Sequence, residues 1–177
     1  FLRRIVDDGS VAAVFCKMLP YDGTPIKETL MAQGRFNGDV CNPDYDFLDP
    51  RIALCYGAIG RTVGEWVRGS DCVAAMINHA WHEVFVMERL FEPGADLVAY
   101  KTALSAVTKF SNNILFSVVE EICDGFREGG GECQQYSGLG QIREQILATL
   151  VQQRNRFVYE NQSWLLKGIS KQTLVTA

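Results

Sequence analysis

Most of this chain has hydrophobic residues at the 3.6-residue spacing of amphipathic helices, but one segment near its start does not. Residues 11–19, VAAVFCKML, form a short and nearly continuous apolar run. Such a run is typical of a strand that is covered on both faces in a parallel sheet. A helix that Gly9 ends precedes the run, and a helix over residues 26–33 follows it. The pattern therefore predicts one α/β unit over residues 1–48.

The rest of the chain, residues 49–177, is predicted to be a helical domain. Its apolar spacing indicates four long helices, over residues 51–68, 70–92, 96–126 and 139–166. We expect Ser70 to cap the second helix, a Gly-rich linker over residues 127–140, and a frayed tail from residue 168. Three glycines in the first helix, Gly57, Gly60 and Gly64, indicate either close packing of another backbone or a break.

A single parallel strand cannot satisfy its own backbone donors and acceptors. We therefore expect residues 1–48 to be the edge of a sheet whose other strands lie upstream. The opening FLRRIVDDGS has no initiator Met, which also indicates that the chain was cut from something longer. The predicted fold is mainly α, with one incomplete α/β unit in front of a four-helix bundle-like domain.

Composition narrows the possible functions. The chain has 177 residues and a net charge of −4, so a broad cationic face for nucleic acid is not expected. Its longest apolar runs are far shorter than the roughly 20 residues of a membrane span, and its start lacks the apolar core of a secretion signal. We therefore expect a cytoplasmic protein with no nucleic-acid or membrane partner.

The six cysteines are expected to be thiols. Most of them lie within apolar or helical patterns, where a thiol behaves as a small hydrophobic side chain. No two have the CxxC spacing of a zinc site, and there is no CxxxCxxC loop. The sequence predicts neither a disulfide framework nor a metal site.

Two passages resemble one known family. PYDGTPI, at residues 20–26, and NPDYDFLDP, at residues 42–50, are similar to the last barrel strand and C-terminal extension of cobalamin-binding radical SAM enzymes. The resemblance is strong over about the first 55 residues and general over the helices. It identifies residues 1–48 as the terminal unit of a radical SAM-type partial barrel and residues 49–177 as the C-terminal helical domain.

The resemblance implies a parent enzyme that holds cobalamin, an iron–sulfur cluster and S-adenosylmethionine. This chain lacks the CxxxCxxC loop that would hold the cluster and the DxHxxG motif of the cobalamin domain. We therefore expect no cofactor on the chain alone, no catalytic residue and no activity. Its partners would be the upstream domains of the parent.

Four residues are candidates to contact cofactor or substrate, because ligands of parallel barrels lie at the carboxyl ends of the strands. They are Lys17, Met18, Tyr21 and Asp22. The alternative is a strand-to-helix turn whose Gly and Pro only shape the backbone.

The NPDYDFLDP loop offers further carboxylates, Asp44, Asp46 and Asp49, beside Tyr45. They could orient a polar substrate, or they could make local caps while aromatic residues hold the loop to the core. His79 and His82 share one helical face with Glu83, but no ExxH motif accompanies them. We therefore expect no metal ion at these histidines.

A second functional hypothesis is a stand-alone helical module that binds a protein partner or a second copy of itself without catalysis. Its basis is a set of aromatic anchors that could lie at an interface: Trp66, Trp81, Phe85, Phe110 and Trp164.

Overall fold

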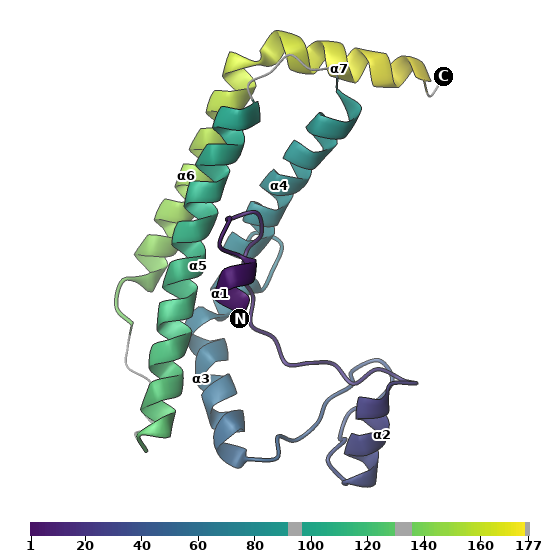
Figure 1. The fold of residues 1–177 in the computed structure, drawn as a ribbon, viewed down its shortest axis with the longest axis vertical. Helices are drawn as coiled ribbons and strands as arrows, with labels where there is room; N and C mark the ends of the chain where they lie inside the picture. The colour runs from purple at the N-terminus through teal and green to yellow at the C-terminus, as the bar shows by residue number, and fades with distance from the viewer. Residues whose placement is uncertain (92–96, 130–135, 176–177) are drawn as a thin grey trace. The chain divides into compact units, whose positions relative to one another are not determined.

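The computed structural model describes residues 1–91, 97–129 and 136–175, and this part of the chain is mainly helical (Figure 1). The prediction of a mainly α fold is confirmed. The helices are α1 (Leu2–Ile5), α2 (Pro25–Ala32), α3 (Pro50–Val67), α4 (Val73–Leu90), α5 (Leu97–Arg127), α6 (Leu139–Glu160) and α7 (Gln162–Val175). None of them is both long and apolar enough to cross a membrane.

The chain divides into two compact units. Unit 1 comprises residues 1–14, 63–118 and 135–177, and unit 2 comprises residues 15–62 and 119–134. The division predicted at residue 48, between an α/β unit and a helical domain, stays a prediction.

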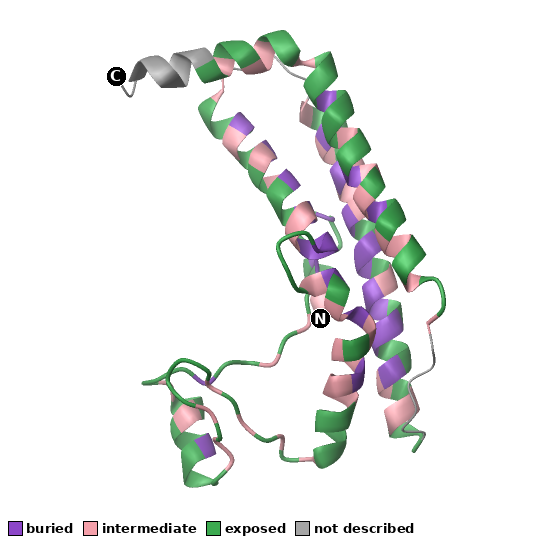
Figure 2. Ribbon diagram, turned by 180° about the vertical axis from the view of Figure 1, so that it is seen from behind, coloured by how far each residue is buried: buried purple, intermediate pink, exposed green. Residues whose placement is uncertain are grey.

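Unit 1 has an apolar core between α4, α5 and α6. Ile77 and Val84 from α4, Leu104 from α5 and Leu150 from α6 are all buried in it. Figure 2 shows buried positions recurring along one side of these helices, which is the pattern that the helical spacing predicts. At the end of this core, the ring of Phe157 stacks on that of Tyr100 with centroids 4.6 Å apart.

Polar side chains inside unit 1 attach the start of the chain to α5. Asn112 is buried, its Oδ1 accepts from the amide of Ala13 at 2.8 Å, and its Nδ2 donates to the carbonyl of Val11 at 3.0 Å. Gly9 has φ +70°, and a Cβ there would lie 2.4 Å from the carbonyl oxygen of Ser105. Only glycine permits both the turn and this close approach.

Unit 2 contains α2 and a hairpin-like loop that joins α2 to α3. Phe36 and Tyr45 form an isolated antiparallel bridge, and the amide of Asp46 donates to the carbonyl of Arg35 at 2.8 Å. Leu30 of α2 is almost completely buried. The helix predicted over residues 26–33 is confirmed: Thr24 is the N-cap of α2, Pro25 lies in its first turn, and the helix ends before Gly34, which has φ +66°.

The strand predicted over residues 11–19 is absent from the structure. Residues 12–20 have no regular secondary structure, and no described segment forms a ladder with them. A strand depends on hydrogen bonds from a neighbouring strand, and the described chain offers none to this segment. The α/β unit is therefore not formed within the described residues.

Three local predictions also differ from the structure. Cys72, not Ser70, is the N-cap of α4, and its Sγ accepts from the amide of Ala75 at 3.4 Å. The predicted helix over residues 139–166 breaks at Asn161, whose side chain donates to the carbonyl of Phe157 at 2.9 Å. The tail that we expected to fray continues α7 as far as Val175.

The glycines of α3 do not break it, since the helix is continuous from Pro50 to Val67. A Cβ at Gly57 or Gly64 would meet only the side chain of the arginine four residues later, Arg61 or Arg68. At these two positions the predicted approach of another backbone is not found among the described residues. Part of the predicted linker, residues 130–135, lies outside the described residues.

Candidate functional site around Lys17

The four residues predicted to contact a ligand lie in unit 2, on and beside the turn that leads into α2. Met18 and Tyr21 are exposed, with 51% and 59% of their surface accessible. The side chain of Lys17 is 17% exposed, because it packs against the loop that precedes α3. Asp22 is exposed and forms an ion pair with Lys27. The structure thus separates these residues into two that are available and two that are engaged.

Lys17 is the centre of the most closely connected group in unit 2. Its ammonium lies 2.5 Å from Oδ1 of Asp44 and also donates to the backbone carbonyl of Tyr45. The same ammonium stands over the ring of Tyr45, 4.3 Å from its centroid, and over that of Phe47, at 4.9 Å. The backbone amide of Lys17 donates to the hydroxyl of Tyr56 at 3.1 Å. We call these five residues the Lys17 cluster.

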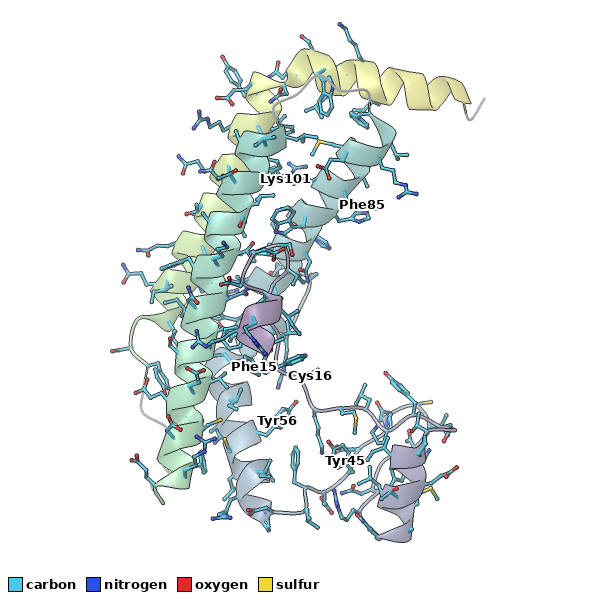
Figure 3. The ribbon with its side chains drawn as sticks, viewed as in Figure 1. Phe15, Cys16, Tyr45, Tyr56, Phe85 and Lys101 are labelled. Atoms are coloured by element: carbon cyan, nitrogen blue, oxygen red, sulfur yellow. The ribbon has the colours of Figure 1, made fainter. Side chains whose placement is uncertain are left out.

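The aromatic members of the Lys17 cluster also contact one another. The rings of Tyr45 and Phe47 meet edge to face at 5.6 Å, and those of Phe47 and Tyr56 are 5.9 Å apart. Figure 3 labels Tyr45 on the loop and Tyr56 on α3. A cation over aromatic faces is stabilised by their quadrupoles, by about 0.5–2 kcal/mol according to how far it is desolvated.

Asp44 supplies the negative charge of the cluster. The hydrogen bond from Lys17 and the backbone amide of Tyr45, which donates to Oδ1 at 2.8 Å, lower the pKa of Asp44 below its ordinary value. This carboxylate is therefore ionised throughout the neutral range, where it is engaged with Lys17.

A second lysine repeats this arrangement on α2. Lys27 contacts the carboxylate of Asp22 and stands over the ring of Phe36, 4.5 Å from its centroid. Phe36 is also the bridge partner of Tyr45. The two passages that carry the family resemblance are thus connected within unit 2, from Asp22 through Lys27 and Phe36 to Tyr45.

The other carboxylates of the loop are used locally. Oδ1 of Asp46 accepts from the side chain of Asn37 at 3.0 Å, and Oδ1 of Asp49 accepts from the amide of Arg51 at 2.9 Å at the start of α3. Arg51 also lowers the pKa of Asp49 through its side chain and its amide. The arrangement agrees with the structural alternative for this loop, in which acids cap the backbone and aromatic residues hold it.

The two histidines of α4 lie in unit 1, His79 beside an ion pair between α4 and α6. Glu83, which the sequence places beside them, accepts hydrogen bonds from Nε and Nη2 of Arg154, at 2.9 and 2.8 Å. His79 lines a hollow of about 280 Å³ beside this ion pair. Burial and the nearby Glu83 raise the pKa of Tyr100 to about 12. Among the described residues, no three His, Cys, Asp or Glu side chains gather in a way that could hold a metal ion.

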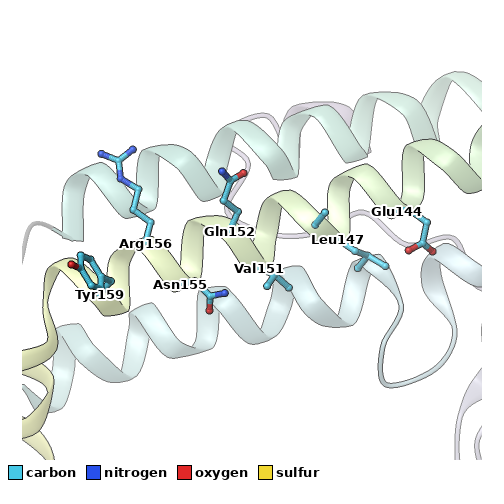
Figure 4. A pocket seen from close by; sticks show the side chains of 8 residues that line it. Glu144, Leu147, Val151, Gln152, Asn155, Arg156 and Tyr159 are labelled. Atoms are coloured by element: carbon cyan, nitrogen blue, oxygen red, sulfur yellow. The ribbon is translucent and has the colours of Figure 1, made fainter.

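A hollow of unit 1 runs along one face of α6 (Figure 4). It has a volume of about 770 Å³ and is shallow. Its lining combines apolar side chains with amides and charges: Glu144, Leu147, Ala148, Val151, Gln152, Asn155, Arg156 and Tyr159. It has no cluster of titratable groups suited to catalysis.

The aromatic residues proposed as interface anchors divide into two groups. Trp66 is buried, Trp81 donates from Nε1 to the hydroxyl of Thr108 at 3.3 Å, and Trp164 packs on Phe91 with ring centroids 5.2 Å apart. Phe85 and Phe110 are half exposed, at 52% and 50%. Only these last two have the exposure that an interface anchor needs.

Sequence reasoning missed the partners of Lys17 and the buried Asn112. Lys17 is the one charged residue in the apolar run of residues 11–19, which is the signal that could have marked it as a residue with a dedicated partner. Asn112 stands within an otherwise ordinary helical pattern, and nothing in its spacing distinguishes it from the exposed Asn113.

Comparison with protein-family profiles, with curated proteins and with solved structures gives no match for this chain.

Proposed function

We propose that this chain is the C-terminal part of a cytoplasmic, cobalamin-dependent radical SAM enzyme. Residues 1–48 then complete the edge of its partial barrel, and residues 49–177 form a four-helix bundle-like domain that covers the barrel. The iron–sulfur cluster, S-adenosylmethionine and cobalamin are held by upstream domains, because this sequence contains neither the CxxxCxxC loop nor the DxHxxG motif. The chain alone has no catalytic activity.

The observation that carries the proposal is that the apolar segment between Val11 and Tyr21 has unpaired backbone amides and exposed apolar side chains. It has no regular secondary structure, and the amides of Val14, Cys16 and Met18 donate no hydrogen bond to any described residue. The amides of Ala12, Ala13 and Lys17 donate to side chains and to no strand. Met18 and Leu19 leave about half of their surface exposed. Unpaired backbone groups together with exposed apolar side chains are what a strand presents when its neighbouring strand is missing.

The Lys17 cluster gives independent support. It connects the apolar run that leads into PYDGTPI to the NPDYDFLDP loop, although 27 residues separate Lys17 from Asp44. In this proposal the cluster sets the distance between the last barrel strand and the start of α3. Lys17 and Asp22 are then positioning residues, and the exposed Met18 and Tyr21 are the side chains that contact the cofactor or substrate.

The coding sequence upstream of Phe1 tests this proposal. We expect it to encode, in the same frame, a CxxxCxxC loop and before that a cobalamin-binding domain. An initiator codon directly before Phe1 would overturn the proposal. As a biochemical counterpart, the purified chain incubated with iron and sulfide is expected to develop no cluster absorbance, whereas the product of the longer frame develops it.

A second candidate function is a helical module that associates with a protein partner or with a second copy of itself. The observation that favours it is the hollow along α6, where Val151 and Tyr159 are exposed beside Leu147. Sedimentation at several concentrations tests the version with a second copy. A rising sedimentation coefficient that is abolished by Val151→Asp, but not by Thr149→Asp on the same helix, would favour the module.

A further inference from the structure

Two cysteines of unit 2 lie next to each other, although they are far apart in the sequence. Cys55 is in α3 and Cys123 is in α5, and their Sγ atoms are 3.8 Å apart. Both residues are partly buried and partly exposed, so a small oxidant dissolved in water can reach them. The other described thiols differ: Cys16 and Cys41 are exposed, and Cys72 is buried and caps α4.

We propose that Cys55 and Cys123 form a reversible oxidation site that closes to a disulfide. The two sulfur atoms must approach from 3.8 Å to a bonding distance of about 2.05 Å. The two thiols are already in contact, one from α3 and one from α5, so the approach is short. The site is independent of the proposed function, since it needs no cofactor and lies within unit 2.

The oxidant in this proposal is hydrogen peroxide. The thiolate of one cysteine attacks a peroxide oxygen, the O–O bond breaks, and a sulfenic acid and hydroxide form. The second thiolate then attacks the sulfenic sulfur, the S–S bond forms, and a second hydroxide leaves. The two protons released by the thiols convert both hydroxides to water. Two electrons pass from the sulfur pair to the peroxide, and a dithiol reductant reverses the reaction.

Disulfide formation changes the stability of unit 2. The bond closes a chain segment between two positions 68 residues apart, which restricts the unfolded chain more than the folded one. The oxidised protein is therefore expected to have a higher Tm than the reduced protein, and a dithiol reductant is expected to return the Tm to its original value.

Peptide mapping identifies the pairing directly, because cleavage after Lys and Arg places each of the six cysteines on a different peptide. After peroxide treatment of the native chain, the peptide over residues 52–61 is expected to be linked to the peptide over residues 110–127. The intact protein loses the mass of two hydrogen atoms, and treatment with a dithiol restores it. These readouts use the unmodified sequence, so no variant has to fold for the test to work.

Matched variants check the specificity. Cys55→Ser and Cys123→Ser are each expected to abolish the linked peptide and to leave a sulfenic acid that dimedone traps on the remaining cysteine. Cys16→Ser and Cys41→Ser are expected to leave the linked peptide unchanged. A link through any other cysteine, a link between two molecules, or separate oxidation of Cys55 and Cys123 in the unmodified chain would overturn the proposal.

Discussion

Unit 1 and unit 2 are held together by different kinds of contact. In unit 1, aliphatic side chains from three helices meet, and Ile77 has no accessible surface at all. In the part of unit 2 before α3, Leu30 is the largest fully buried side chain, and the main connections run through Lys17 and Lys27 to carboxylates and aromatic rings.

This difference shows which unit has the larger apolar core of its own. Burial of apolar surface is the dominant favourable contribution to folding, and unit 1 supplies it from its own helices. Lysines that contact exposed carboxylates and aromatic rings contribute less, because water competes for the same charges. The first part of unit 2 is therefore held by local polar and aromatic contacts and has little apolar core.

The largest expected effect comes from the core of unit 1. Ile77→Ala should lower the free energy of unfolding by about 3 kcal/mol, because it leaves a cavity at a site with no access to solvent. Urea denaturation followed by circular dichroism measures this loss. Phe85→Ala, a larger truncation at an exposed position of the same helix, is the control and should cost less than about 1 kcal/mol. Equal losses in the two variants would contradict the assigned core.

A smaller effect is expected at the polar attachment of the first residues to α5. Asn112→Ala removes the acceptor of the Ala13 amide and the donor to Val11, and should cost about 1–3 kcal/mol. Amide exchange at Ala13 should accelerate in the same variant. Asn113→Ala, at the adjacent exposed position, should change neither quantity. If both variants behave alike, the attachment of this segment through Asn112 is wrong.

In unit 2, the loss of one charge should act locally. Lys17→Met removes the ion pair with Asp44 and both cation–π contacts, which together are expected to contribute about 1 kcal/mol. Hydrogen exchange over residues 44–47 should increase while exchange in α4 stays unchanged. Lys17→Arg keeps the charge and should retain most of the protection. If Lys17→Met lowered the free energy of unfolding as much as Ile77→Ala does, the proposed difference between the two units would be wrong.

The smallest expected effect is the acid titration of the Lys17 cluster. Because the pKa of Asp44 is lowered in the folded chain, its contribution is complete above the ordinary carboxyl range and is lost as the pH falls through the lowered value. NMR titration of the Asp44 carboxyl carbon measures this. In Lys17→Met the pKa of Asp44 should rise toward its ordinary value, with the amide of Tyr45 retaining part of the shift. An unchanged titration would show that Lys17 does not contact Asp44 in solution.

The helices could be predicted from the sequence because the signals for them are local. The spacing of apolar residues after Asp49-Pro50 predicts α3. The start of α2 is indicated by Thr24-Pro25 and its end by Gly34. The break at Asn161 could not be predicted, since the apolar spacing continues through it and the side-chain bond to Phe157 is visible only in three dimensions.

The absence of the strand and the contacts of the Lys17 cluster could not be predicted from the local sequence, because both depend on residues far away in the chain. The apolar run of residues 11–19 indicates a strand, but a strand forms only beside a partner, and the described chain has none for it. The contact between Lys17 and Asp44 depends on how the loop before α3 folds back, and no spacing rule covers that distance. Met18 and Tyr21 were predicted from their place at the end of the run, and their roles stay predictions.

Amide exchange at Val14, Cys16 and Met18 tests whether residues 11–19 complete a sheet. In this chain these amides should exchange at nearly the rate of an unstructured peptide, because they donate to no described residue. In the protein expressed from the longer reading frame, we expect a neighbouring strand to slow the exchange of these amides by at least about a hundredfold, which corresponds to about 2.7 kcal/mol. Fast exchange in both proteins would contradict the claim that this segment completes a sheet.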